Sequence, residues 1–182
     1  MHHISKEFDF CYGHRVYTQV LDKELSCNMS CKCRHQHGHQ GKVVVNLEAL
    51  EVDSRGMVID FNELQWFKKW LDDVLDHKMI LSINDPALGT FYPLLKDTVH
   101  KKTQYYQDEY LIIRPEHYSN LPNYEQEIYE GLVLVSFVPT SENLSKWLWE
   151  VVNKKIGHLC KVRSVQFMET PKTQAIYYEN PN

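Results

Sequence analysis

The sequence predicts an α+β domain in which four antiparallel strands form one sheet and two helices lie on one face of it. Three observations predict this class: two strand-like runs near the N-terminus, two amphipathic helical patterns in the middle, and two strand-like runs at the C-terminus. The order is therefore strand, strand, helix, helix, strand, strand, with a long connection between the helices. This order is typical of α+β rather than of alternating α/β proteins.

The predicted strands follow period-two patterns. Residues 4–10 alternate apolar and polar side chains, and residues 42–50 contain the run VVVNLEAL. The last two strands are VRSVQFM at 162–168 and TQAIYY at 173–178, separated by ETPKT, which suits a turn. Four such strands leave two open sheet edges, so we expect a symmetric homo-oligomer.

The predicted helices have recognisable ends. Asp60 and Glu63 have the spacing of a capping box, and an apolar stripe follows it as far as the LDH at 75–77. The second helix begins at Pro139–Ser141 and stops at Gly157. The stripes consist of Leu64, Phe67, Leu71 and Val74 in the first helix, and of Leu144, Leu148 and Val151 in the second.

The connection at about 80–138 is too long to be an unstructured loop in a compact domain. It contains two strand-like runs, LIIRP and GLVLVSFVP, joined by the tyrosine-rich HYSNLPNYEQEIYEG. We expect it to be ordered and to lie beside the mouth of the active site or against a neighbouring subunit. The whole chain, 1–182, is expected to form one domain.

Composition excludes several classes of protein. The net charge of −4 argues against a nucleic-acid binder that relies on a basic surface, and no apolar run is long enough for a membrane span or the core of a signal peptide. Five cysteines are an odd number, which favours reduced thiols over a disulfide framework. We expect a cytoplasmic protein with no membrane or nucleic-acid partner.

The segment CKCRHQHGH, residues 31–39, is the candidate for chemistry. His37 and His39 flank one residue at the entry to a strand, so both imidazoles point to the same face, and His14 at the end of the preceding strand lies close by in an antiparallel pair. Three imidazoles suit Zn²⁺ with an open fourth position. The alternatives are solvated histidines, a structural Cys2His2 zinc site and a redox C-x-C pair. Cys31 and Cys33 are too close for the usual zinc-finger spacing, and no helix N-terminus follows to activate a redox thiol.

Six segments in order resemble the 6-pyruvoyltetrahydropterin synthase and 6-carboxytetrahydropterin synthase family. They are FCYGH at 10–14, CRHQHGH at 33–39, GMVIDF at 56–61, LDH at 75–77, PTSEN at 139–143 and ET at 169–170. The resemblance covers the chain except for 80–138, where compact bacterial members have a shorter connection. It implies the tunnelling fold, the ββααββ unit, assembled as a hexamer, with Zn²⁺ as the cofactor.

The resemblance also implies residue roles. His14, His37 and His39 take the positions of the zinc ligands, Asp76 and His77 those of a catalytic pair, Glu169 that of the pterin anchor, and Thr140 that of a weaker pterin contact. The catalytic cysteine matches Cys33 if the C-x3-HGH spacing applies and Cys31 if the C-x5-HGH spacing applies; we take Cys33 as the candidate. Without the resemblance, Asp76 and His77 would be interpreted as a helix end and Glu169 as a solvated residue.

The implied substrate is 7,8-dihydroneopterin triphosphate, with Lys32, Arg34, Lys42 and Lys78 as unranked candidates for the triphosphate contacts. Two lyase products are open. One is 6-carboxytetrahydropterin with release of acetaldehyde, on the route to queuosine precursors, and the C-x3-HGH spacing favours it. The other is 6-pyruvoyltetrahydropterin, on the biopterin route. A third possibility is a zinc-binding protein that keeps the fold without catalysis.

Overall fold

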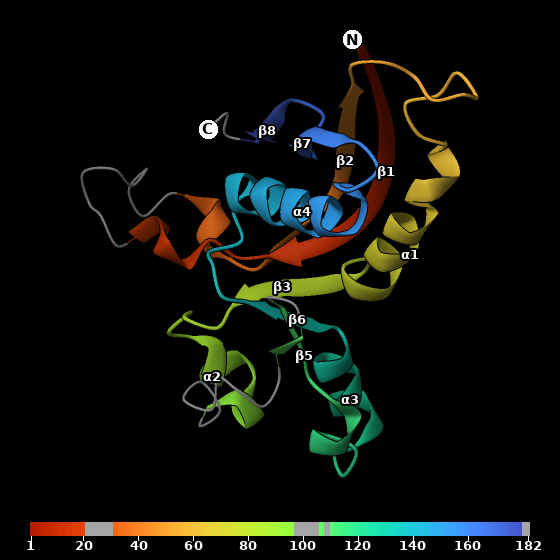
Figure 1. The fold of residues 1–182 in the computed structure, drawn as a ribbon. Helices are drawn as coiled ribbons and strands as arrows, with labels where there is room; N and C mark the ends of the chain where they lie inside the picture. The colour runs from red at the N-terminus through yellow and green to blue at the C-terminus, as the bar shows by residue number, and fades with distance from the viewer. Residues whose placement is uncertain (21–30, 97–105, 108–109, 180–182) are drawn as a thin grey trace. The chain divides into compact units, whose positions relative to one another are not determined.

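The computed structural model describes residues 1–20, 31–96, 106–107 and 110–179 (Figure 1). The strands are β1 His2–His14, β2 His37–Ala49, β3 Lys78–Ser82, β4 Tyr106–Gln107, β5 Tyr110–Ile112, β6 Leu132–Val135, β7 Lys161–Thr170 and β8 Thr173–Tyr178. The α-helices are α1 Gln65–Val74, α2 Leu88–Phe91, α3 Asn123–Glu130 and α4 Ser141–Ile156. Short 3-10 turns are η1 Tyr17–Val20, η3 Lys32–Arg34, η4 Phe61–Leu64, η5 Pro93–Leu95 and η6 Pro115–His117.

The chain forms two compact units. Unit 1 comprises residues 1–11, 39–76 and 140–182, and unit 2 comprises residues 12–38 and 77–139. Strands β1 and β2 each begin in one unit and end in the other, because the boundary cuts β1 after Cys11 and β2 after Gly38. That the chain is a single domain stays a prediction.

Unit 1 contains the elements that the sequence predicts. Its strands follow the order β1-β2-β7-β8, and β7 pairs antiparallel with both β2 and β8. Alternate residues of β2, Val43, Val45 and Leu47, are buried, as the period-two pattern requires. Helix α4 lies against β7 and β8 (Figure 1), and the Trp70 ring of α1 meets Trp147 of α4 at 5.5 Å between centroids.

The predicted cap at Asp60 and the predicted ends of the second helix are confirmed, but α1 itself begins only at Gln65. The Asp60 side chain accepts a hydrogen bond from the Asn62 N–H, and the chain makes the turn η4 before α1 begins. Thr140 caps α4 by accepting from the Asn143 N–H, and Gly157 follows its last residue. The β7–β8 turn is tighter than the segment ETPKT suggests, since the strands end and restart at Thr170 and Thr173.

Unit 2 has its own sheet and core. Strand β3 pairs parallel with the end of β1, with His14 opposite Ile80; β6 pairs parallel with β3, and β5 antiparallel with β6. Figure 1 shows α2 and α3 in this part of the chain. Its buried cluster consists of Leu81, Ile83, Leu88, Tyr92, Leu95, Leu111, Ile113, Tyr118, Tyr129, Leu132 and Leu134.

The sequence did not predict β3 or the parallel pairing. The run KMILS is only five residues long, and an apolar run of that length does not distinguish a strand from a stretch of buried loop. The expectation that LIIRP and GLVLVSFVP supply strands is confirmed for 110–112 and 132–135. The tyrosine-rich stretch between them forms η6 and α3, and two of its tyrosines, Tyr118 and Tyr129, belong to the core.

The α+β class is confirmed. The predicted strands pair antiparallel in unit 1, and unit 2 adds strands with parallel pairing. In the part of the chain that the structure describes, no helix is long and apolar enough to cross a membrane. Cys27 lies outside the described residues; Cys11 and Cys160 are free thiols.

Candidate metal centre

His14, the last residue of β1, is 1% exposed. Its Nδ1 lies 2.7 Å from the carbonyl oxygen of Pro139. A carbonyl oxygen only accepts hydrogen bonds, so Nδ1 must carry the proton and donate it. In the neutral imidazole, Nε2 of His14 is then left with a lone pair.

His37, the first residue of β2, is held in the same way. Its Nδ1 lies 2.8 Å from the carbonyl oxygen of His35, so this nitrogen is also the donor. Histidines that bind metals commonly donate their second nitrogen to a carbonyl or carboxylate, which fixes the ring and its tautomer.

The two Nε2 atoms of His14 and His37 lie 3.1 Å apart. Both are acceptors in the neutral tautomers that the carbonyls select, so neither can donate a hydrogen bond to the other. Two nitrogens on one tetrahedral zinc ion would lie about 3.4 Å apart, given Zn–N distances of about 2.0–2.1 Å. The pair therefore fits two ligands of one cation better than it fits a hydrogen bond.

His39 follows two residues later on the same strand and contacts a carboxylate. Its Nε2 is 3.1 Å from Oε1 of Glu169 in β7, and both side chains are partly buried. Ser141, at the start of α4, donates its hydroxyl to the other oxygen, Oε2, at 3.0 Å. Glu169 is thus held by one residue from β2 and one from α4.

Gly38, between the two histidines, sits against the main chain of β1. A Cβ at this position would lie 3.2 Å from the carbonyl oxygen of Tyr12, which is a tight contact. Glycine therefore allows β1 and the start of β2 to approach closely. In the described residues, His14 and His37 of unit 2 and His39 and Glu169 of unit 1 carry donor atoms of the kinds that hold a metal ion.

The two candidate thiols lie just before this strand. Cys33 is the middle residue of η3, and its carbonyl accepts a hydrogen bond from the Val16 N–H at 2.9 Å. Cys31 precedes η3, and its carbonyl accepts from Nε of Arg34 at 3.1 Å. Both cysteines are half-buried, so exposure alone does not choose between them.

The predicted pair Asp76 and His77 lies at the end of α1. Oδ1 of Asp76 accepts a hydrogen bond from the Cys11 N–H at 2.7 Å, which ties this end to β1. His77 has a φ of +58°, in the left-handed region that non-glycine residues rarely adopt. Such strain is kept where the surrounding structure imposes it and is common at functional sites.

Thr140, proposed above as a pterin contact, caps α4. Of the candidate cations, Lys42 is paired with Glu7 at 2.7 Å, and this contact raises the pKa of the lysine. Lys78 donates to the carbonyl of Glu130 at 2.9 Å. Both lysines therefore have local partners, which makes them weaker candidates for phosphate contacts.

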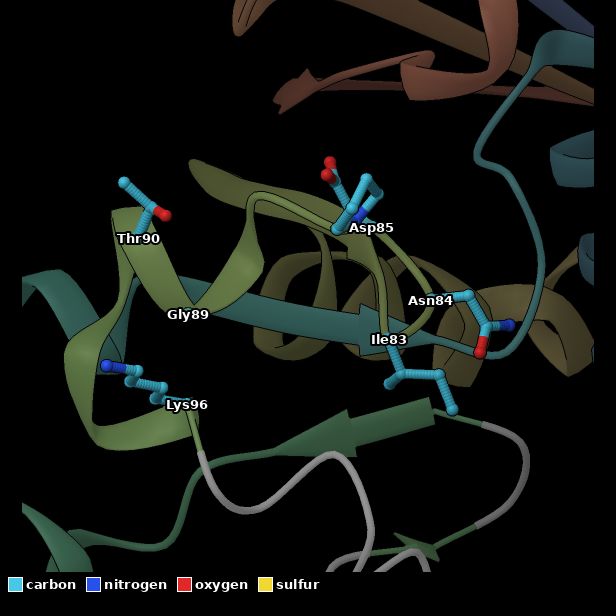
Figure 2. Close-up of a pocket in the computed structure, with 7 residues that line it drawn as sticks. Ile83, Asn84, Asp85, Gly89, Thr90 and Lys96 are labelled. Atoms are coloured by element: carbon cyan, nitrogen blue, oxygen red, sulfur yellow. The ribbon is translucent and has the colours of Figure 1, made fainter. Parts of the chain in front are cut away.

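Unit 2 contains a cavity of about 570 Å³ in the segment that follows β3. Figure 2 shows the residues that line it. None of the predicted site residues lines it. The lining residues are Ile83, Asn84, Asp85, Pro86, Gly89, Thr90 and Lys96.

Sequence reasoning missed the groups that orient the predicted ligands. Ser141 lies in the PTSEN segment, but nothing in that pattern shows that its hydroxyl reaches Glu169, 28 positions away. The carbonyl groups of Pro139 and His35 are main-chain atoms, which leave no signal in the sequence.

A model of the family described as 6-pyruvoyl tetrahydropterin synthase matches residues 3–180. The chain belongs to this family. Family membership confirms the resemblance that the six sequence segments suggested.

Two individual proteins are similar to this chain along its whole length. A 6-carboxy-5,6,7,8-tetrahydropterin synthase of Aquifex aeolicus is 30% identical over 97% of both chains. The crystal structure of an uncharacterized protein from Wolinella succinogenes is 44% identical over 98% of both chains, with a TM-score of 0.88.

A more distant structure of this family supports the fold alone. The 6-pyruvoyl tetrahydropterin synthase of Caenorhabditis elegans is 22% identical, covers 98% of this chain with 95% of its own length, and gives a TM-score of 0.58. The predicted tunnelling fold is thereby confirmed.

Proposed function

We propose that this protein is a zinc-dependent 6-carboxy-5,6,7,8-tetrahydropterin synthase. It would convert 7,8-dihydroneopterin triphosphate to 6-carboxytetrahydropterin, acetaldehyde and triphosphate. His14, His37 and His39 would bind the zinc ion, and Cys33, Asp76 and His77 would carry the proton transfers.

The pair of Nε2 atoms in His14 and His37 is the observation that carries this proposal. Both imidazoles have their tautomers set by carbonyl groups, and both direct a lone pair into one place at 3.1 Å separation. Such an arrangement is unfavourable without a cation, because two acceptors face each other. Imidazole nitrogens are typical zinc ligands, and zinc accepts three of them while keeping a fourth position open.

When bound, zinc would supply a Lewis acid that stabilises negative charge on the oxygens of the substrate side chain. Residues of the chain would carry out the proton transfers. A thiolate at Cys33 would remove a proton from a side-chain carbon of the pterin, and His77 would deliver a proton to another side-chain atom, with Asp76 orienting it. The φ of +58° at His77 supports this role, because it sets the direction of that side chain at the end of α1.

Glu169 would recognise the pterin ring. A carboxylate can accept two N–H groups from an aminopyrimidine edge in a planar pair. The Ser141 hydroxyl on Oε2 supports this role, since it restrains the rotation of the carboxylate before substrate binds. The close approach of Oε1 to His39 means that the same carboxylate would also help to orient that imidazole.

The choice of the 6-carboxy product rests on the full-length similarity to the Aquifex aeolicus enzyme and on the C-x3-HGH spacing of Cys33. The second candidate is a 6-pyruvoyltetrahydropterin synthase. The observation that favours it is Cys31, which satisfies the longer C-x5-HGH spacing and is as accessible as Cys33.

Incubation of the zinc-loaded protein with 7,8-dihydroneopterin triphosphate, followed by mass spectrometry of the products, tests the proposal. We expect 6-carboxytetrahydropterin and acetaldehyde. Accumulation of 6-pyruvoyltetrahydropterin would select the second candidate. A protein that binds zinc without any turnover would overturn the enzymatic proposal and favour a zinc-binding protein that keeps the fold.

A further inference from the structure

Arg15, the residue after His14, makes an ion pair with Asp85. Nη1 of Arg15 lies 3.2 Å from Oδ1 of Asp85, and the side chains are 16% and 1% exposed. The same carboxylate oxygen accepts the Ala87 N–H at 2.9 Å, and the guanidinium carbon lies 5.2 Å from the centre of the Phe91 ring. The guanidinium of Arg15 is therefore held by the Asp85 carboxylate and by the Phe91 ring, and the Ala87 N–H in turn holds the carboxylate.

Arg15 also reaches the segment that carries Cys33. Its Nε donates to the carbonyl oxygen of Arg34 at 2.7 Å, and the next residue, Val16, donates its N–H to the carbonyl of Cys33 at 2.9 Å. Two hydrogen bonds thus fix η3 to the chain just after β1. One of them comes from a side chain whose direction is set by Asp85.

Asp85 lines the cavity of unit 2 together with Ile83 and Lys96, and Figure 2 shows its carboxylate directed away from those two side chains. A carboxylate that is 1% exposed is costly to bury unless a cation and hydrogen bonds compensate for it. Arg15 and the Ala87 N–H supply that compensation at Oδ1, whereas Oδ2 has no hydrogen-bond partner in the described residues.

We propose that Asp85 is a positioning residue for the thiol of Cys33 and acts through Arg15. The residue lies in the 80–138 segment, so this segment would contribute to the catalytic site and not only decorate the fold. The proposal rests on the proposed function in one respect, namely that Cys33 is the catalytic base.

The test measures the alkylation rate of each cysteine by iodoacetamide in the full-length protein, with peptide mass spectrometry as the readout. In the Asp85→Asn variant, Arg15 loses its charge partner, so the hydrogen bonds between η3 and residues 15–16 should break more often. We expect the alkylation rate of Cys33 to rise about tenfold, the change that a weakened hydrogen bond produces in a local opening equilibrium. Cys160 should stay unreactive, because it is buried and burial raises the pKa of its thiol.

Two further variants sharpen the test. Arg15→Lys keeps the positive charge near Asp85 but cannot also donate to Arg34 in the same geometry, so it should raise the rate at Cys33 as Asp85→Asn does. The double variant should show little additional effect, because both changes break one chain of contacts. Glu48→Gln is the control: it removes another buried carboxylate paired with an arginine, in unit 1, and should leave Cys33 unchanged.

The outcomes separate this proposal from the proposed function. With pterin substrate, Asp85→Asn should lower kcat about tenfold with KM within about twofold, since the thiol and not the binding surface is displaced. If the wild-type protein shows no turnover, the proposed function fails, but the alkylation rates still decide the positioning role. An unchanged rate at Cys33, or equal rises at Cys33 and Cys160, would overturn the proposal, because the latter reports general loss of stability.

Discussion

His14 and His37 each use Nδ1 for a main-chain carbonyl, so the main chain and not the solvent sets the direction of their Nε2 lone pairs. This arrangement makes the proposed ligands rigid before any metal binds, which favours binding because less conformational freedom is lost. It also explains why Pro139 and His35 matter although neither side chain takes part. Metal binding by His14 and His37 therefore depends on the direction in which main-chain carbonyls hold the rings as well as on residue type.

The first prediction separates the two cysteines. Cys33→Ala should keep the fold and the zinc but lose nearly all turnover, because it removes the proposed base. Cys31→Ala should retain most of the turnover. Zinc analysis and steady-state kinetics on both variants measure this, and the reverse result would assign the longer motif spacing.

The second prediction concerns the backbone of His77. Because φ is +58°, His77→Gly should be more stable than His77→Ala by about 1 kcal/mol in urea unfolding, since only glycine adopts the left-handed region without cost. Both variants should lose turnover if His77 transfers a proton.

Lys69 is a matched control for this comparison. It is an exposed residue inside α1, where alanine should be the more stable replacement by about 1 kcal/mol. Equal stabilities of the two His77 variants would show that the left-handed backbone is not strained.

His14, His37 and His39 could be proposed from side-chain type and spacing, and Cys33, Asp76 and Glu169 from the family resemblance. Ser141, Arg15 and Asp85 could not. Their contacts join positions 28 and 70 residues apart, and no local pattern encodes such distances.

At the scale of elements, β2 and β7 are joined by side-chain ion pairs in addition to their backbone hydrogen bonds. Glu48 of β2 accepts a hydrogen bond from Lys161 and one from Arg163, both at 2.8 Å and both from β7. These hydrogen bonds, first from Lys161 and then from Arg163, lower the pKa of Glu48 below its ordinary value. A charged cluster thus fixes the register at one end of the pair.

The third prediction follows from this lowered pKa. A carboxyl group whose pKa is lower in the folded state stabilises the fold above its unfolded-state pKa, and the contribution is lost as the pH falls through the folded-state value. Glu48→Gln should therefore lower the free energy of unfolding by about 1 kcal/mol near neutral pH and by little at pH of about 3. Urea unfolding at both pH values measures it. Glu51→Gln, at an exposed position, should show no such difference, and a pH-independent loss in Glu48→Gln would contradict the electrostatic account.

The helices and the long strands could be predicted because their patterns extend over ten or more residues and have distinct caps. Strand β3 could not, since five residues carry too little periodicity and its parallel partner is β1, more than sixty positions earlier. Strand β6 lies in the predicted run GLVLVSFVP, but its parallel pairing with β3 could not be predicted, since the strand is buried along its whole length and shows no alternation.

At the scale of the whole molecule, the segment 80–138 forms much of unit 2 and of its buried cluster. Replacement of residues 104–128 by a Gly/Ser linker would remove Leu111, Ile113 and Tyr118 from this cluster. Removal of three buried side chains costs several kcal/mol, a large share of the stability of a small unit.

The fourth prediction replaces that deletion by a milder change. Tyr124 and Ile128 are exposed on α3, one helical turn apart, at 68% and 50%. If this face meets a neighbouring subunit or covers the pocket, Tyr124→Ser with Ile128→Ser should weaken the oligomer in analytical ultracentrifugation or raise KM, without loss of thermal stability in the monomeric state. Glu127→Gln, exposed on the same helix, is the control. Unchanged assembly and KM would show that the face is peripheral.

X-ray absorption at the zinc K edge of the loaded protein tests the central claim most directly. The account predicts one zinc per chain with only nitrogen and oxygen neighbours at about 2.0–2.1 Å, and loss of this signal in His37→Ala. A sulfur neighbour at about 2.3 Å would contradict it, because a cysteine bound permanently to the metal could not serve as the base.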